Sequence, residues 1–434
     1  QVLAYAGSPD YFADADFGRN DGVLALRQPG SALKPFLYEL ALERRAIRPA
    51  TILADVPVSY ALGNARLYRP SDYSARFAGP VRVRVALADS LNVPAVRVLE
   101  RVGVDAFLDR LHALGFSRLD KSAAYYGLGL ALGGGEVSLY ELARAYAAMA
   151  RGGDAPELVE SLDAPALPQP QRRDPTWVLV TDMLADDHAR AAAFGTHSIL
   201  SLPFAAAVKT GTSSDFRDTW TAGFSRDYTV AVWVGNFDGS PMRGVSGVTG
   251  AAPLWSRIML HLHERRDPAP FDPPSGYVRR PLCAETGTPP LPGCAVVMEW
   301  LDASDLAAYA RARPHPLSDA YDLWLTAQPV RARLATRILF PADGDVFELV
   351  TGLGVQRLKF EIAGREAATA RAFVNDVPLQ RTGGDYLWPL RRGFFELRVA
   401  SARGSSSVRF SVVAPVPRRQ GFTIASGPSS AKTR

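Results

Sequence analysis

The chain has 434 residues, 47% of them hydrophobic and 21% charged, with a formal net charge of +5. This length is too great for one ordinary domain, so we expect two or three domains with apolar cores. The basic residues form no run typical of a nucleic-acid-binding surface, and no stretch of about 18 apolar residues could span a bilayer, so neither role is predicted.

Residues 1–265 alternate helical and strand patterns. The first seven residues, QVLAYAG, predict a strand, and the apolar residues that follow Ser31 recur at helical spacing. A break around residues 90–94 divides two predicted helices in VRVRVALADSLNVPAVRVLERVG. The N-terminus has no signal-peptide pattern. Because it reads as the middle of a strand, we expect the sequence to be a fragment of a longer protein.

The rest of this region predicts a helix, a group of strands and a final helix. In SLYELARAYAAMARGG, Ser138 and Glu141 form a capping box, and the two glycines end the helix. Turn-like residues separate the runs FAAAVKTGTS, DTWTAGFS and YTVAVWVGN, which predicts antiparallel hairpins. A helical pattern returns in GAAPLWSRIMLHL. Helices around an antiparallel sheet are typical of an α+β domain.

Residues 266–330 are expected to form a Pro-rich linker and a bridging segment. They contain both cysteines of the chain, Cys283 and Cys294. Two cysteines without a nearby histidine do not make a zinc site. A short Pro- and Gly-rich loop between them favours a disulfide, and therefore an oxidising compartment, over two unpaired thiols.

The pattern changes after residue 330. Short apolar runs separated by turns predict seven strands over residues 331–414, which is typical of a small β-sandwich. The last residues, 415–434, are expected to be disordered.

Lysine is rare in this chain. Only five of its 49 basic residues are lysines. A desolvated ammonium can lose its proton whereas a guanidinium cannot, so a lysine here is a candidate for chemistry. Lys34 lies three residues after Ser31 in RQPGSALKPF, a spacing that places both side chains on one face of a helix. The same spacing at Ser429 and Lys432 lies in the tail and is assigned no function.

Two further motifs follow along the chain. The predicted helix break contains Ser90-Leu91-Asn92, and a predicted strand contains Lys209-Thr210-Gly211-Thr212. Alone, the first also fits an ordinary capped turn and the second an edge-strand lysine. Together, Ser-x-x-Lys, Ser-x-Asn and Lys-Thr-Gly in this order are the set found in penicillin-binding proteins and β-lactamases.

Four stretches resemble the transpeptidase domain of class A penicillin-binding proteins: RQPGSALKPF, ADSLNVPAVRVLERVG, LGLGLALGGGEVSLYELARAYAAMARGG and AVKTGTSSDFRDTWTAGFSRDYTVAVWVGNFDGSPM. The stretch KTGTSSDFRD, with SGVTGAAPLW after it, is most similar to the penicillin-binding protein 1C branch. The resemblance implies that residues 1–265 form a serine β-lactamase/transpeptidase-like α+β domain, an antiparallel sheet flanked by helices. It also implies that residues 331–414 form a small immunoglobulin-like all-β domain.

The resemblance implies a location and partners as well. The family's membrane anchor and N-terminal glycosyltransferase domain are absent from this sequence, so membrane attachment is expected only through the missing anchor. The implied location is the periplasmic side of the bacterial inner membrane. Peptidoglycan stem peptides and β-lactam antibiotics are the expected ligands, and a cell-wall protein is the expected partner of the C-terminal domain.

The chemistry of the motifs suggests catalytic roles. A serine hydroxyl needs a base to become a nucleophile, and no histidine lies in a motif, so Lys34 is the expected base for Ser31. Ser31 would attack a D-Ala-D-Ala stem peptide, and the acyl group would then pass to an amine of a neighbouring peptide. Ser90 would relay a proton to the leaving amine, Lys209 would tune it, and Asn92 would bind the donor peptide's amide. Neither a cofactor nor a metal is expected.

By resemblance, the remaining motif residues bind substrate. The backbone N–H groups of Ser31 and Thr212 are expected to form the oxyanion hole. The hydroxyls of Thr210 and Thr212 would hold the substrate carboxylate beside Lys209. Gly211 would let the substrate approach the strand, which would bind the peptide as an added strand.

Two alternatives stay open. A serine β-lactamase needs an efficient deacylating base, usually a Glu, and Glu157 and Glu160 lie between the second and third motifs in surroundings that do not resemble the lactamase loop. A β-lactam sensor or inactive scaffold could keep the motifs without turnover. The deacylation rate distinguishes the lactamase, and turnover of a peptide substrate distinguishes an enzyme from a sensor.

Overall fold

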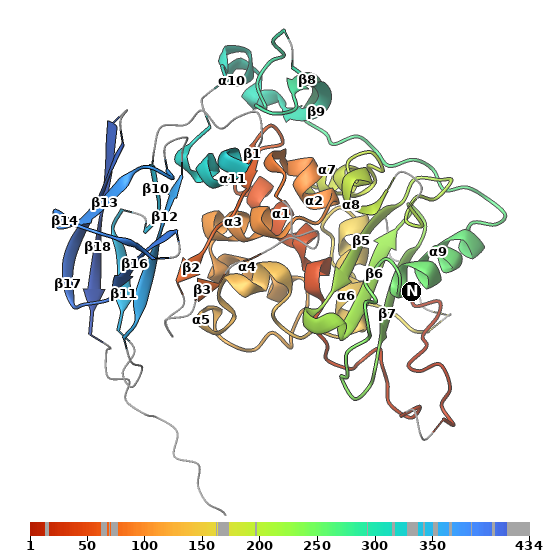
Figure 1. Ribbon diagram of the computed structural model, residues 1–434. Helices are drawn as coiled ribbons and strands as arrows, with labels where there is room; N and C mark the ends of the chain where they lie inside the picture. Colours follow the sequence, from red (N-terminus) through yellow and green to blue (C-terminus); the bar gives the residue numbers. More distant parts are fainter. Residues whose placement is uncertain are drawn as a thin grey trace, which may run out of the picture. The chain divides into compact units, whose positions relative to one another are not determined.

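The computed structural model forms two compact units (Figure 1). It describes residues 1–13, 17–61, 67–68, 70, 77–161, 163, 173–195, 198–292, 294–314, 317–327, 337–341, 343–349, 355–363, 367–382, 384–401 and 404–414. The larger unit comprises Gln1–Val58 and Pro70–Leu317, and the sandwich unit comprises Ser59–Arg69 and Ser318–Arg434.

The larger unit contains a three-stranded antiparallel sheet flanked by helices, as predicted. Its strands, in order, are β5 (Ala207–Thr212), β6 (Asp218–Phe224) and β7 (Thr229–Gly235). Helix α9 (Ala251–Leu262) packs on one face, where Gly223 leaves room for the ring of Trp255. Helix α6 (Leu139–Ala150) also packs against β6 and β7 (Figure 1).

The other elements of the larger unit are mostly helical. The α-helices are α1 (Lys34–Glu43), α2 (Val83–Ala88), α3 (Asn92–Val102), α4 (Val104–Ala113), α5 (Ala123–Tyr126), α7 (Pro175–Leu184), α8 (Ala191–Phe194) and α10 (Leu306–Arg311). The 3-10 helices are η2 (Gly30–Leu33), η3 (Gly127–Leu132), η4 (Ser214–Phe216) and η5 (Ala303–Asp305). Two antiparallel pairs complete it: β1 (Ile52–Asp55) with β4 (Gly79–Arg82), and β8 (Tyr277–Cys283) with β9 (Val296–Asp302).

Local sequence signals explain where several helices begin and end. The predicted break between α2 and α3 is present but lies at residues 89–91, because Pro94 falls within the first turn of α3 rather than in the break. The capping box of α6 is also confirmed: Ser138 Oγ accepts from the Glu141 N–H at 3.1 Å, and the Glu141 carboxylate accepts from the Ser138 N–H at 3.0 Å. These reciprocal bonds satisfy donors that the first turn of a helix leaves without partners.

The prediction of a strand at residues 1–7 is wrong. These residues form no strand, and Val2 instead donates its N–H to Val159 O at 2.8 Å. One backbone bond to a loop does not make a ladder, and most side chains of residues 1–7 are exposed rather than buried in a sheet.

The segment after α9 packs back onto the larger unit. Arg226, in the turn between β6 and β7, donates to Pro270 O at 3.0 Å and to Asp272 at 2.8 Å. The β8–β9 hairpin follows, and Glu299 on β9 is fully buried against Arg84 of α2, with an N–O distance of 2.6 Å. The expected domain boundary after residue 265 therefore falls inside this unit. Residues before position 265 form ion pairs with residues after it.

The two cysteines form a disulfide. Cys283 at the end of β8 is bonded to Cys294, just before β9, with the two Cα atoms 5.6 Å apart. The bond closes the loop of the hairpin, residues 284–293, whose sequence AETGTPPLPG contains three prolines and two glycines.

The sandwich unit contains two sheets with a shared apolar core. One sheet has the order β10–β12–β16–β15 and the other β11–β18–β17–β13–β14. The strands are β10 (Arg337–Phe340), β11 (Asp345–Glu348), β12 (Arg357–Ala363), β13 (Arg371–Val374), β14 (Val377–Pro378), β15 (Arg381–Thr382), β16 (Asp385–Pro389), β17 (Gly393–Ser401) and β18 (Gly404–Val413). The unit also holds β2 (Tyr60–Ala61), β3 (Leu67–Tyr68), η6 (Asp319–Tyr321) and α11 (Asp322–Ala327).

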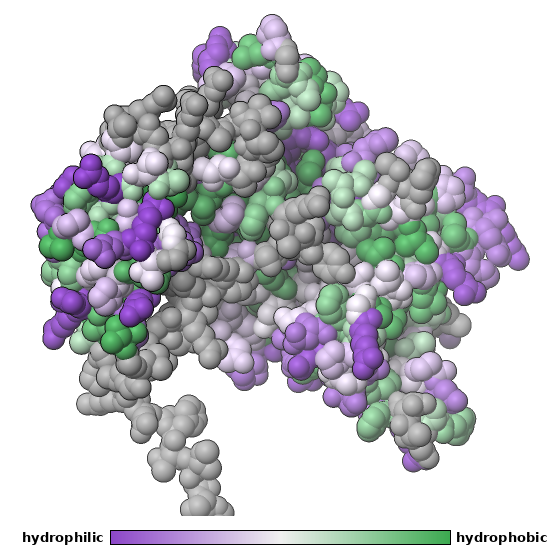
Figure 2. Space-filling model, in the orientation of Figure 1, coloured by the Kyte–Doolittle hydropathy of each residue, from purple (hydrophilic) through white to green (hydrophobic). Residues whose placement is uncertain are grey.

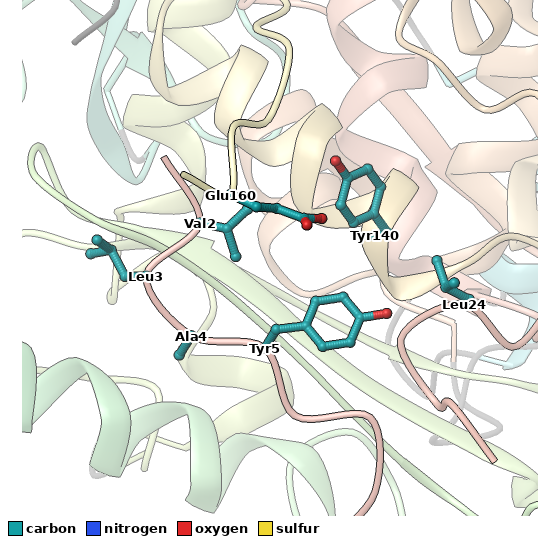
Figure 3. Close-up of a pocket in the computed structure, with 7 residues that line it drawn as sticks. All are labelled: Val2, Leu3, Ala4, Tyr5, Leu24, Tyr140 and Glu160. Atoms are coloured by element: carbon teal, nitrogen blue, oxygen red, sulfur yellow. The ribbon is translucent and has the colours of Figure 1, made fainter. Parts of the chain in front are cut away.

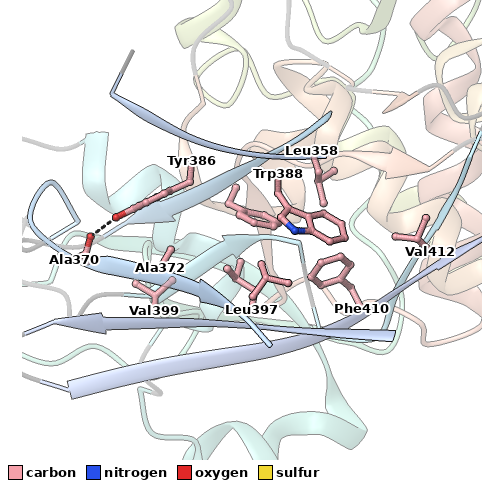
Figure 4. Close-up of a cluster of buried hydrophobic side chains, with 11 residues drawn as sticks. Leu358, Ala370, Ala372, Tyr386, Trp388, Leu397, Val399, Phe410 and Val412 are labelled. Atoms are coloured by element: carbon pink, nitrogen blue, oxygen red, sulfur yellow. Dashed lines mark hydrogen bonds between the residues drawn. The ribbon is translucent and has the colours of Figure 1, made fainter. Parts of the chain in front are cut away.

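All seven predicted strand runs of this unit are present as strands. Side chains from both sheets meet between them, among them Trp388 on β16 and Phe410 on β18, whose ring centroids are 5.5 Å apart (Figure 4). Within this core, the hydroxyl of Tyr386 donates to Ala370 O at 2.7 Å. One feature was not predicted: β11 pairs with β18 in parallel.

The surface mixes polar and apolar residues. Figure 2 shows hydrophobic and hydrophilic residues interspersed over the visible face. Exposed apolar side chains such as Leu254 and Leu260 on α9 are scattered singly, which is ordinary for a folded chain. Over the described ranges, no helix combines the length and apolar character of a membrane span.

Replacing Glu299 by Gln is expected to destabilise the larger unit by about 3 kcal/mol, because Arg84 would stay buried with only Asp182 and Asp186 to balance it. Calorimetric unfolding of the whole chain measures this change. As a control, Glu264→Gln removes an exposed pair with His261 and should change the unfolding free energy by less than about 1 kcal/mol. Equal changes in unfolding free energy for both substitutions would contradict the prediction that the buried ion pair of Glu299 stabilises the larger unit.

A chain ending after residue 265 is expected to melt at a lower temperature than a chain ending after residue 317. The shorter chain lacks Asp272 and Glu299, so Arg226 and Arg84 lose partners. Thermal unfolding followed by circular dichroism compares the two. Identical melting temperatures would show that residues 266–317 do not support the larger unit.

Candidate active site

Ser31 lies in a tight turn that leads directly into helix α1. It belongs to the 3-10 helix η2, and α1 begins at Lys34 with Pro35 in its first turn. A 3-10 helix has three residues per turn, so side chains at positions i and i+3 lie above one another. Ser31 and Lys34 therefore share one side of the turn, as the sequence spacing predicted.

Two buried aromatic side chains hold this turn. Trp220 on β6 donates its indole N–H to Gln28 O at 2.8 Å, and Tyr146 on α6 donates its hydroxyl to Ala32 O at 2.9 Å. Both rings are fully buried. The backbone on either side of Ser31 is thus fixed by the sheet and by a helix.

Three glycines allow three backbones to meet beside Ser31. Gly30 has a φ of +55°, and a Cβ placed there would lie 2.3 Å from Thr212 O. A Cβ on Gly211 would lie 2.1 Å from the carbonyl oxygen just before Gly30, and one on Gly133 would lie 2.3 Å from Gly30 O. Only glycine fits at such distances. The contact places the backbone of Thr212 beside the turn of Ser31.

The amine of Lys34 is surrounded by oxygen atoms. It is fully buried and donates to Ser90 O at 2.6 Å, to Leu91 O at 3.1 Å and to Asn92 Oδ1 at 2.7 Å. Three acceptors at these distances match the three N–H bonds of an ammonium group. In this arrangement the second motif positions the lysine of the first.

The hydroxyl of Ser90 joins the two motif lysines. Lys209 Nζ lies 2.7 Å from Ser90 Oγ, and Lys34 Nζ lies 3.5 Å from the same atom. Ser90 has a φ of +63°, a conformation that is uncommon for a residue with a side chain and that costs about 1–3 kcal/mol. The break between α2 and α3 therefore holds a strained residue so that its hydroxyl faces both amines.

Burial lowers the pKa of Lys209 well below its usual value, and the positive charge of Lys34 lowers this pKa further. The residue is only 2% exposed, and its amine also donates to Thr210 O at 2.9 Å. Because two buried ammonium groups repel each other, the pair of amines favours holding fewer protons than two isolated lysines would.

The two threonines of the third motif lie on β5, at the edge of the sheet. Among the described residues β5 pairs only with β6, so its other edge has no strand beside it. Thr212 Oγ1 accepts a hydrogen bond from the Gly247 N–H at 3.0 Å. An unpaired edge beside the two hydroxyls suits an extended peptide, which would add backbone hydrogen bonds to β5.

The sequence analysis missed Asp218, a buried carboxylate that ties the end of β5 to its surroundings. It accepts from the hydroxyl of Ser213 at 2.9 Å and from the indole N–H of Trp233 at 3.1 Å, and its oxygen lies 3.7 Å from Arg27 Nε. The signal that could have found it is an acidic residue shortly after Lys-Thr-Gly-Thr, within a run otherwise predicted as a strand.

A cavity of about 520 Å³ lies away from these motifs, against the N-terminal segment. Its lining residues include Tyr5, Tyr140 and Glu160, and Figure 3 shows the Glu160 carboxylate pointing toward Tyr140. None of the three motifs contributes a lining residue.

A serine–histidine pair elsewhere does not form a second nucleophile. Ser225 Oγ lies 2.8 Å from His263 Nε2, but Ser225 is 1% exposed and its oxygen also accepts from the N–H groups of Asp227 and Tyr228. These bonds fix the turn between β6 and β7 to the end of α9. The pair is a structural contact that substrate cannot reach.

Comparison with known proteins agrees with this geometry. Residues 1–259 match the family described as "Penicillin binding protein transpeptidase domain", and residues 325–410 match the "Penicillin-Binding Protein C-terminus Family". Penicillin-binding protein 1C of Escherichia coli (strain K12) is 36% identical over 284 residues, which cover 65% of this chain and 36% of the relative. Penicillin-binding protein 1A of Neisseria gonorrhoeae is 30% identical over 302 residues, 64% of this chain and 36% of that protein.

A solved structure shows the same fold. Penicillin-binding protein 1A from Haemophilus influenzae aligns with a TM-score of 0.54 and 22% identity, over 69% of this chain and 50% of that one. The chain spans about a third of the length of the curated relatives it matches. Since the transpeptidase family covers more than half of the sequence, the chain belongs to the penicillin-binding protein transpeptidase family.

Proposed function

We propose that the chain is a serine-type DD-transpeptidase that cross-links peptidoglycan stem peptides through an acyl-enzyme on Ser31. The observation that supports this best is the hydroxyl of Ser90, which contacts two buried lysine amines beside the turn of Ser31. A hydroxyl between two amines can pass a proton in either direction, and acyl transfer needs such a relay twice.

In the first step, Ser31 Oγ forms a bond to the carbonyl carbon of the penultimate D-Ala, and its proton passes to Lys34. The bond to the terminal D-Ala then breaks, and the leaving amine takes a proton through Ser90. In the second step, an amine of a neighbouring peptide attacks the ester, the new amide forms, and Ser31 regains its proton.

Lys34 can act as the base only as a neutral amine. Its three oxygen neighbours suit an ammonium, so a proton must leave before Ser31 is activated. Burial, and then the positive charge of Lys34, lower the pKa of Lys209, so the two amines together favour holding fewer protons than two isolated lysines would. Ser90, within reach of both amines, offers the route by which the pair redistributes its protons.

Substrate binding follows from the edge of the sheet. The N–H groups of Ser31 and Thr212 would stabilise the oxyanion, because the glycine contacts bring their backbones together. Thr210 and Thr212 would hold the terminal carboxylate beside Lys209, and Gly211 lets strand β5 approach the turn of Ser31. Asn92, which contacts Lys34 through its Oδ1, would bind the donor peptide's amide.

We propose that this chemistry takes place on the periplasmic side of the inner membrane. The Cys283–Cys294 disulfide supports an oxidising compartment. For the sandwich unit we propose a cell-wall protein as partner.

A β-lactam is expected to acylate Ser31 and to remain attached for many minutes, because the surroundings of Glu157 and Glu160 do not resemble the loop that supplies the deacylating base of a lactamase. Intact mass spectrometry over time measures the adduct, and peptide mapping locates it. Ser31→Ala should abolish labelling, whereas Ser225→Ala should label at the normal rate if the protein folds. Loss of the adduct within seconds would instead favour a β-lactamase.

Replacing Lys34 by Arg is expected to slow acylation at least a hundredfold, because a guanidinium keeps the charge but cannot accept a proton. Lys209→Arg should be milder, since a positive charge near the carboxylate is retained. Stopped-flow acylation with a chromogenic β-lactam measures both. The exposed Lys121→Arg, which keeps a pair with Asp120, serves as control. Near-normal acylation by the Lys34 variant would show that Lys34 is only structural.

A further inference from the structure

The loop before α9, residues 246–250, lies directly on strands β5 and β6. A Cβ placed on Gly247 would lie 2.7 Å from Gly211 O and 2.9 Å from both Thr210 Cβ and Trp220 O. No residue with a side chain fits there without a shift. The backbone of Gly247 is therefore in contact with the Lys-Thr-Gly strand.

This contact includes a hydrogen bond to a motif side chain. The Gly247 N–H donates to Thr212 Oγ1 at 3.0 Å. A threonine hydroxyl has one hydrogen and can also accept. Because its oxygen accepts here, its hydrogen is left for an acceptor, and within the described residues Thr212 Oγ1 makes no other hydrogen bond. The Gly247 bond thus occupies one lone pair of this hydroxyl and orients it, while its hydrogen remains available to donate to an acceptor.

A buried side chain of β6 holds the loop in this position. Thr221 is fully buried and donates its hydroxyl to Gly247 O at 3.2 Å. The same carbonyl accepts from the Ala252 N–H at 2.9 Å, at the start of α9. Gly247 is therefore fixed to the sheet through Thr221 on its carbonyl side, while its N–H reaches Thr212 on the neighbouring strand.

We propose that Thr221 is a positioning residue for carboxylate recognition: by holding Gly247, it orients the Thr212 hydroxyl to donate to the terminal carboxylate of the substrate. This role rests on the transpeptidase function proposed above. It gives Thr221 no contact with substrate. Its effect should appear only with substrates that carry the carboxylate.

The test uses the whole chain and two probes, an acyl-D-alanyl thioester of thioglycolate with a free carboxylate and the methyl ester of the same compound. Thr221→Val should lower kcat/KM about tenfold for the carboxylate probe and less than twofold for the ester. Thr221→Ser should restore the carboxylate rate. The matched control is Thr219→Val, because Thr219 is equally buried on β6 but donates to Val234 O at 3.0 Å instead.

A double substitution tests the coupling. If Thr221 acts through Thr212, adding Thr221→Val to Thr212→Val should cause no further loss on the carboxylate probe. Gly247→Ala leaves Thr221 in place but displaces the loop, so it should show the same selective loss on the carboxylate probe. If melting curves show that Thr221→Val does not fold, Gly247→Ala takes its place in the test.

Equal losses on both probes, or additive losses in the double variant, would overturn the proposal and make Thr221 an ordinary core residue. A normal carboxylate rate in Thr221→Val would also overturn it. If the unsubstituted chain turns over neither probe and Ser31 is not labelled by a β-lactam, the proposed function itself fails, and this role fails with it.

Discussion

Two lysine amines buried against one serine hydroxyl are the constraint on which the rest of the larger unit depends. Lys34, Ser90 and Lys209 come from segments far apart in the sequence, yet both amines lie within 3.5 Å of Ser90 Oγ. Taking two ammonium groups out of water is unfavourable, and placing them together adds repulsion. The fold offsets this with carbonyl and amide oxygens around Lys34 and with the hydroxyl of Ser90 beside Lys209, although the strained backbone of Ser90 adds a further cost.

The backbone around these side chains is as tightly fixed as the side chains themselves. Gly30, Gly133 and Gly211 let the Ser31 turn, the helix η3 and strand β5 approach closer than any side chain would permit. Trp220 and Tyr146 then hold the turn through its carbonyl oxygens. An oxyanion hole built from backbone N–H groups needs this rigidity, because its donors must already point at the place where charge develops.

The sequence alone was sufficient to predict those parts of the site and of the fold that depend on short-range residue patterns. Ser31 and Lys34 share a side because three-residue spacing suits a tight helical turn, and the α6 capping box follows from Ser138 and Glu141 alone. The Gly247–Thr212 bond joins positions 35 residues apart and leaves no local pattern. The same holds for the parallel pairing of β11 with β18. Residues 1–7 show that a local pattern can also mislead. Their sequence resembles a strand, but in the structure they pair with no strand.

The part of the larger unit beyond the matched transpeptidase region also supports the site. Arg84 lies in α2, the helix that leads into Ser90, and its guanidinium is held by Glu299 from β9 as well as by Asp182 and Asp186. Residue 299 lies outside the 1–259 match. At the other end of α2, a carboxylate oxygen of Asp89 accepts from the Ala193 N–H at 2.9 Å, and burial raises the pKa of Asp89. The helix before Ser90 is thus fixed at both ends, which keeps the strained hydroxyl between the two amines.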